Sequence, residues 1–375
     1  MLQRLLMNTS TNRVPMINFP LNRQNNFNLL RLVFATLVLL SHAPELLDGN
    51  RSRELLTNAF HTVSFGEFAV DGFFLLSGYL IVKSWCNAPD LVQFSRSRIL
   101  RIFPGFIVAT IFCAFVVGPL ASTPTVYFSD FSFLKLAEST AQLKPPTLPM
   151  VFAGTHYASV NGAMWTISLE FVCYIGVLVA GLIGLTKRPR LWLTLTVTLL
   201  VIFTLQRFGF LSNVHGKYLF SHPLVRLGSF FLVGGTFYLF HEKFIFDRKF
   251  AWVAAATLLI GMFSWRLSEL ALATAGGYLL FYFAFAQIPY IVSFNKLPDI
   301  SYGVYLYGWP VQKLLLWYFP MMSPWLLFIG SCGGAFTLGA MSWYTIEKPC
   351  LKFKRKKPSN EPIVELNPAQ SYLLK

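Results

Sequence analysis

Long apolar stretches alternate with short polar segments along almost the whole chain. Each stretch is close to the roughly 17–25 residues that a helix needs to cross a bilayer. We expect ten such helices, at about residues 28–46, 63–82, 102–120, 162–186, 190–206, 223–241, 250–266, 271–291, 300–318 and 323–345. The pattern predicts a transmembrane domain at 27–346 between a short tail at 1–26 and a basic polar tail at 347–375. The largest segment between spans, about 121–161, contains four prolines and is expected to be a loop.

The composition points to the same class of protein. Of the 375 residues, 55% are hydrophobic and only 13% are charged, and the mean hydropathy is +0.54. Soluble domains contain about 25% charged residues. Disorder and a small disulfide-stapled secreted domain are both excluded by these values. The five cysteines form no CxxC pair, so neither a disulfide framework nor a metal site is predicted.

The distribution of basic residues predicts the orientation of the spans. In a soluble protein the net charge of +15 would suggest nucleic acid as a partner. Here, an even number of spans places both termini on one side, and that side carries roughly three times as many Lys and Arg residues as the other. Basic loops stay in the cytoplasm. We therefore expect an all-α integral membrane protein of about ten transmembrane helices, with both termini cytoplasmic and no nucleic-acid partner.

Two ionisable residues lie on one face of the first predicted span. A charged side chain inside the bilayer costs roughly 2.5–3.5 kcal/mol, so each one is a candidate for function. Arg31 and His42 are eleven residues apart, which is within about 20° of three full helical turns and about 16.5 Å along the axis. Each residue also has a simpler interpretation, because Arg31 could extend to the inner interface and His42 could lie at the outer one.

The second and fourth predicted spans contain carboxylates. Glu67 and Asp71 are four residues apart on one helical face, and Asp71 lies within the bilayer by any placement of the span. It therefore needs a cation or a hydrogen-bond donor, or must be protonated. Ser77 and Gly78 follow and could simply let helices approach closely. Glu170 lies about 12 Å below the outer edge of its span, where it could also be structural.

Three arginines converge at the cytoplasmic start of the third span, in the stretch FSRSRILRIFPGF. The positive-inside rule accounts for basic residues here, but not for arginine at all three positions. The planar guanidinium group of arginine suits phosphate. The cluster therefore predicts either a topology signal or a site for a phosphorylated cytosolic ligand, formed by Arg96, Arg98 and Arg101.

These features, taken in order along the chain, resemble the acyltransferase 3 family of integral-membrane O-acyltransferases, which modify bacterial O-antigens and other surface glycans. The resemblance rests on motifs across about residues 27–350: the Arg31–His42 spacing, GFFLLSGYLI (72–81), RSRILRIFP (96–104), WTISLEFVCY (165–174), ISYGVYLY (300–307) and the closing Glu347–x–Pro349. It implies an acetyl-CoA donor, a carbohydrate hydroxyl acceptor and a location in the bacterial inner membrane. The sequence departs from the family at Gly308, where many members have histidine.

The resemblance also implies roles for individual residues. His42 is expected to be the catalytic base, because imidazole is the usual proton acceptor near neutral pH. Asp71 or Glu170 could orient it, and the sequence does not choose between them. Arg31, Arg98 and Arg101 are expected to hold acetyl-CoA.

Other questions stay open at this level. Trp165, Tyr302 and Tyr305 lie in the motifs and are expected to contact substrate. Direct transfer and an acyl-histidine route both fit these residues. A glycolipid transporter is the alternative function, although no inverted repeat is visible. The sequence predicts no oligomeric state.

Overall fold

The computed structural model describes residues 14–15, 25–210, 222–286, 288, 291 and 293–353. Most of the predicted tail at 1–26 and residues 354–375 of the predicted tail at 347–375 lie outside the described residues. Within them, helices dominate, and a two-residue strand β1 (Val14–Pro15) pairs antiparallel with β2 (Ile245–Phe246).

Each of the ten predicted spans coincides with a helix or a continuous run of helices. They are α1 (Phe27–Asp48), α3 (Phe65–Asn87), α4 (Leu91–Phe112) continuing through a π-helical turn into α5 (Gly118–Leu120), α8 (Trp165–Leu182), α9 (Pro189–Arg207), α10 (His222–Leu239), α11 (Arg248–Met262), α12 (Ser268–Ala271) continuing into α13 (Gly277–Phe285), α15 (Ser301–Tyr318), and α16 (Pro324–Ser342) continuing into α17 (Lys348–Lys352). Among the described residues, seven of these segments are long and apolar enough to cross a membrane, whereas α10, α11 and α15 are not. The count of ten crossings and the side on which the termini lie stay predictions.

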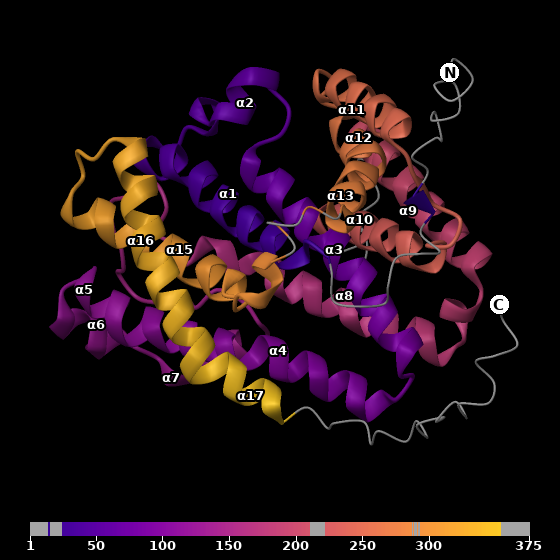
Figure 1. Ribbon diagram of the computed structural model, residues 1–375. Coiled ribbons are helices and arrows are strands. Elements are labelled where there is room, and N and C mark those ends of the chain that lie inside the picture. Colours follow the sequence, from indigo (N-terminus) through magenta and orange to yellow (C-terminus); the bar gives the residue numbers. More distant parts are fainter. Residues whose placement is uncertain are drawn as a thin grey trace, which may run out of the picture.

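Helices α1 and α3 lie in the middle of the molecule, with α15 and α16 on one side and α10 to α13 on the other (Figure 1). The crossing of α3 and α10 is close because both helices have glycine there. A Cβ atom on Gly78 would lie 1.9 Å from the carbonyl oxygen of Phe231, and one on Gly234 would lie 2.0 Å from that of Leu75. Small residues let helix backbones meet in this way, so the structural interpretation of Gly78 fits.

The start of α3 explains the position of Glu67. Ser64 caps the helix by accepting the backbone N–H of Glu67, and the carboxylate of Glu67 accepts the backbone N–H of Ser64 at 2.9 Å. This reciprocal capping box satisfies backbone donors that a helix start leaves free. Glu67 thus has a local structural role at the end of the span.

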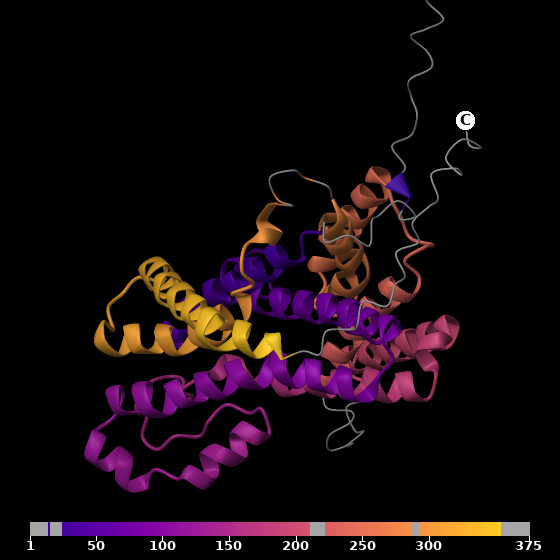
Figure 2. The ribbon, with the colours of Figure 1, turned by 60° about the horizontal axis from the view of Figure 1, so that its bottom comes forward.

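The expectation of a loop at 121–161 was wrong in part. This segment contains two short helices, α6 (Pro124–Asp130) and α7 (Phe133–Ala141). They turn back beside α4 and the π-helical turn that follows it (Figure 2). In this turn the ring of Phe115 lies 5.5 Å from that of Phe131 and 6.3 Å from that of Phe133. The aromatic residues of the segment, spaced irregularly along the chain, supply this packing.

Candidate active site

His42 lies near the C-terminal end of α1, where its closest acidic partner is on the same helix. Its Nδ1 atom is 3.1 Å from Oε2 of Glu45, one turn further along. Glu45 is buried, and its other oxygen accepts hydrogen bonds from Nε of Arg51 at 2.6 Å and from the hydroxyl of Tyr157 at 2.7 Å. Two donors from two other segments therefore hold this carboxylate against the imidazole.

This arrangement fixes the orientation of the His42 ring. A carboxylate beside Nδ1 favours the proton on that nitrogen, which leaves the lone pair of Nε2 for a substrate hydroxyl. Among the described residues, none hydrogen-bonds to Nε2, and the side chain is 19% exposed. The edge of the ring packs against Trp309, with ring centroids 4.8 Å apart. Trp309 is itself held by a hydrogen bond from its Nε1 to the backbone oxygen of Ser159.

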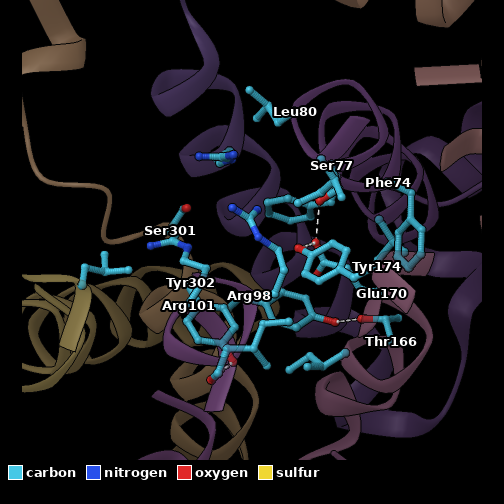
Figure 3. A pocket seen from close by; sticks show the side chains of 18 residues that line it. Phe74, Ser77, Leu80, Arg98, Arg101, Thr166, Glu170, Tyr174, Ser301 and Tyr302 are labelled. Atoms are coloured by element: carbon cyan, nitrogen blue, oxygen red, sulfur yellow. Dashed lines mark hydrogen bonds between the residues drawn. The ribbon is translucent and has the colours of Figure 1, made fainter. Parts of the chain in front are cut away.

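A cavity of about 290 Å³ opens between α1, α3, α4, α8 and α15 (Figure 3). His42 is not among the residues that line it. Arg98 and Arg101 lie on one side of it, and Thr166, Glu170 and Tyr174 lie on the other. The lining residues are Arg31, Val70, Phe73, Phe74, Ser77, Leu80, Ile81, Arg98, Arg101, Ile102, Thr166, Ile167, Glu170, Tyr174, Ser301, Tyr302, Tyr305 and Leu351. Six of the residues predicted from sequence therefore meet at one cavity.

Two of the three cavity arginines share a single carboxylate. Oδ2 of Asp299 lies 2.7 Å from Arg101 and 3.1 Å from Arg31, and its Oδ1 accepts a hydrogen bond from Ser301. Burial alone would raise the pKa of Asp299, but the two guanidinium groups and the Ser301 hydrogen bond together lower it to about 2. Asp299 is therefore ionised at neutral pH and holds both arginines in place.

Arg98 is different, because no carboxylate lies within ion-pair distance of it in the described part of the chain. Its Nε donates to the hydroxyl of Ser97 at 3.1 Å, and the far end of its guanidinium lies 3.4 Å from the hydroxyl of Ser84. The group also sits over the rings of Phe94 and Tyr174. Arg98 therefore offers the cavity a positive charge that no acidic side chain balances directly.

Glu170 lines the cavity rather than lying beside His42. It accepts hydrogen bonds from the hydroxyl of Ser77 at 2.5 Å and from that of Tyr174 at 2.6 Å (Figure 3). These three side chains form a polar group within walls that are otherwise rich in Phe, Leu and Ile. Such a group suits the amides of an extended, otherwise apolar substrate arm.

Asp71 belongs to a separate network. It pairs with Arg226 of α10 at 2.8 Å, Arg226 pairs with Glu269 at 2.5 Å, and Glu269 pairs with Arg207 at 3.1 Å. Val70 and Phe74 on the same helix line the cavity, whereas Asp71 does not. The structure thus places neither Asp71 nor Glu170 beside His42, and Glu45 occupies the position for which both were considered.

The predicted substrate-contacting residues fall in two places. Tyr302 and Tyr305 line the cavity, although their hydroxyl groups bond to backbone oxygens of Ile102 and Ala163. Trp165 is 43% exposed at the start of α8 and does not line the cavity. Tyr305 is one helical turn before Trp309, so α15 connects the lining of the cavity to the ring that packs on His42.

Sequence reasoning missed five residues that build this site: Glu45, Arg51, Tyr157, Asp299 and Trp309. A signal existed for Glu45, since residues three apart on a helix are neighbours. None existed for Arg51 or Tyr157, because their positions depend on how the outer segments fold over α1.

Comparisons with known proteins agree on one family. A family model described as an acyltransferase domain matches residues 24–344. An O-acetyl transferase of Shigella phage Sf6 is 30% identical over 360 residues, covering 88% of this chain and 96% of the phage protein. Nodulation protein 10 of Rhizobium leguminosarum bv. viciae is 27% identical over 370 residues, covering 88% of this chain and 94% of that protein. No solved structure is significantly similar.

Proposed function

Since the chain belongs to the acyltransferase family that this model describes, we propose that it transfers an acetyl group from acetyl-CoA to a hydroxyl of a cell-surface glycan or its lipid-linked precursor. We propose O-antigen as the glycan and the bacterial inner membrane as the location. The name of the phage relative, an O-acetyl transferase, supports an acetyl group and an oxygen acceptor. The observation that carries the proposal is an arginine-lined cavity together with a histidine that Glu45 orients on the same helix as Arg31.

The cavity suits the donor. Acetyl-CoA is anionic at one end and carries its thioester at the end of a long, narrow arm. The phosphates of the donor would bind at the mouth to Arg31, Arg98 and Arg101, because one guanidinium group can donate two parallel hydrogen bonds to a phosphate. Ser77 and Glu170 would meet the amides of the arm further in. The distance from Arg31 to His42, about 16.5 Å along α1, is compatible with the length of that arm.

His42 would act as the base for acyl transfer. Its Nε2 accepts the proton of the acceptor hydroxyl while the hydroxyl oxygen bonds to the thioester carbon. The bond from that carbon to sulfur then breaks, and the departing thiolate takes the proton from Nε2, which yields an ester and free CoA thiol. Glu45 stabilises the imidazolium that forms between these steps, as the carboxylate of a catalytic triad does.

The test is acetyl transfer by the purified chain in detergent, followed as release of CoA thiol, together with mass spectrometry of O-acetyl groups on the surface glycan of complemented cells. We expect His42→Ala to abolish both signals. Glu45→Gln should lower turnover by roughly 100-fold or more, because the amide no longer stabilises the charged ring. His156→Ala changes an exposed histidine of the 121–161 segment and serves as the matched control.

Two outcomes would contradict the proposal. Normal glycan acetylation by His42→Ala at matched membrane abundance would remove His42 as the base. Absence of thiol release by the parent chain, together with movement of glycolipid across vesicle membranes, would favour the transporter instead.

A further inference from the structure

A second, smaller cleft lies at the turn between α3 and α4. Its volume is about 190 Å³, and it is lined by Ser84, Ala88, Gln93, Phe94, Arg96, Ser97 and Arg98. Arg98 belongs to the lining of this cleft and of the main cavity alike. The two hollows therefore share Arg98, the cavity arginine for which the described residues offer no carboxylate partner.

The chemistry of the cleft is that of an anion site. It combines two guanidinium groups, two hydroxyl groups and one side-chain amide, all of which can donate hydrogen bonds. The contacts of Arg98 with Ser84 and Ser97 already gather three of these groups around one point. The carboxylate nearest in sequence, that of Asp90, is engaged as the N-cap of α4, where it accepts the backbone N–H of Gln93 at 2.5 Å.

The ion pairs of the arginines differ between the main cavity and the border that it shares with the cleft. Asp299 neutralises part of the charge of Arg31 and Arg101, and Glu347 lies 3.8 Å from Arg101. Among the described residues, Arg96 makes no ion pair and is exposed. The positive charge left for a ligand is thus concentrated at Arg98 and Arg96, on the cleft side of the cavity mouth.

We propose that this cleft binds the 3′-phosphate of CoA and makes the enzyme selective for donors that carry it. The inference rests on the proposed function, in which acetyl-CoA is the donor. A molecule whose arm lies in the cavity and whose diphosphate lies at Arg98 leaves its ribose at the border between the hollows. The phosphate monoester on that ribose then faces Arg96 and Ser84, and a monoester dianion is the form of phosphate that paired arginines bind most strongly.

The experiment compares acetyl-CoA with 3′-dephospho-acetyl-CoA as donors for the purified chain. We expect the parent to show a KM at least about tenfold lower for acetyl-CoA, since a hydrogen bond to a charged group contributes enough for that factor. Arg96→Gln should raise the KM for acetyl-CoA, leave that for the dephospho donor unchanged and bring the ratio close to one. Arg190→Gln changes an exposed arginine at the start of α9, outside both hollows, and should keep the parental ratio.

Each contrary result has a distinct meaning. Equal KM values for the two donors in the parent would overturn the 3′-phosphate site and leave the acetyl-transfer function standing. A loss in Arg96→Gln that is the same for both donors and disappears in vesicles of neutral phosphatidylcholine would assign Arg96 to anionic lipid headgroups, which also overturns the inference. No transfer from either donor would overturn the proposed function and the inference together.

Discussion

Asp299 holds two of the cavity arginines, Arg31 and Arg101, in place. Arg31 comes from α1 and Arg101 from α4, so two helices far apart in sequence converge on a residue just before α15. An isolated pair of guanidinium groups would repel each other, and the shared carboxylate offsets that repulsion. Because its pKa is lowered to about 2, Asp299 stays charged from acidic to alkaline conditions and keeps this geometry throughout the working range of an enzyme.

Lysine should not replace Arg31. The guanidinium bonds to Asp299 with one nitrogen at 3.1 Å and lines the cavity with the rest of the group, whereas an ammonium group is a point charge on a flexible stem. We expect Arg31→Lys to lower acetyl transfer on the order of 100-fold at matched membrane abundance, since a lost paired contact costs a few kcal/mol. Arg53→Lys, which changes an exposed arginine paired with Asp48, is the control. Activity of Arg31→Lys within about threefold of the parent would mean that Arg31 only extends to the inner interface.

The sequence was informative about the residues that line the cavity and less so about the surroundings of His42. The cost of charge inside apolar spans singled out Arg31 and Glu170. The clustering of arginine at the start of a span singled out Arg98 and Arg101, and the structure groups all four around one cavity. Glu45 was not predicted as the partner of His42, because the prediction favoured carboxylates that lie deep within a predicted span. Asp71 is the deeper residue, but Arg226 from α10 neutralises it, and nothing in the local sequence indicates which helix will lie beside α3.

The crossing of α3 and α10 is the most demanding contact between helices near the cavity. Gly78 follows Ser77 directly, so the backbone that positions Ser77 beside Glu170 is the same backbone that touches Phe231. Any side chain at Gly78 would push α10 away or displace α3.

Gly78→Ala should therefore destabilise the protein more than an alanine in a helix usually does. Overpacking of this kind costs typically 1–3 kcal/mol, whereas Gly to Ala in an open helical position is favourable. Gly176→Ala is the matched control, because a Cβ atom there has nothing within 4 Å. The measurement is the thermal unfolding midpoint of purified protein in detergent. Equal midpoints for the two variants would contradict the close crossing.

Gly308 shows the same effect between α1 and α15. A Cβ atom there would lie 2.4 Å from Cδ1 of Leu39, three residues before His42. Nearby, the side-chain amide of Gln312 donates to the backbone oxygen of Leu39 at 2.8 Å. A histidine at this position would have to displace Leu39, so glycine here matches the close packing of these two helices.

Helix positions were the most predictable part of the fold, since hydrophobic length alone indicates them. All ten predicted spans coincide with helices, and the missed elements are short. α6 and α7 were missed because their aromatic residues, which pack on one another and on Phe115, follow no regular helical period in the sequence. Contacts between elements, unlike the elements themselves, leave little trace in a single sequence.

At the scale of the whole molecule, the proposed acyl transfer requires the donor and the acceptor to reach opposite ends of the helices. The arginines and the cleft lie at the end of α1 and α4 that begins each helix, and His42 lies near the other end of α1. Under the proposed function, a cytosolic donor enters at the arginine end and a glycan outside the cell reaches the histidine end. The excess of basic residues predicts that the arginine end faces the cytoplasm.

This orientation can be tested with two cysteines at opposite ends of the helices. Cys86 is exposed at the end of α3, beside the α3–α4 turn, and Ser52 is exposed just after α1. We expect a membrane-impermeant maleimide to label Ser52→Cys, in a Cys86→Ser background, from outside intact spheroplasts. The parental Cys86 should be labelled only in inverted vesicles, with Cys86→Ser measuring the background from the other cysteines. Labelling of both positions from the same side would contradict the arrangement of the spans. Labelling of Cys86 from outside would place Arg98 and the cleft away from the cytosol, and acetyl-CoA could not then enter where the arginines lie.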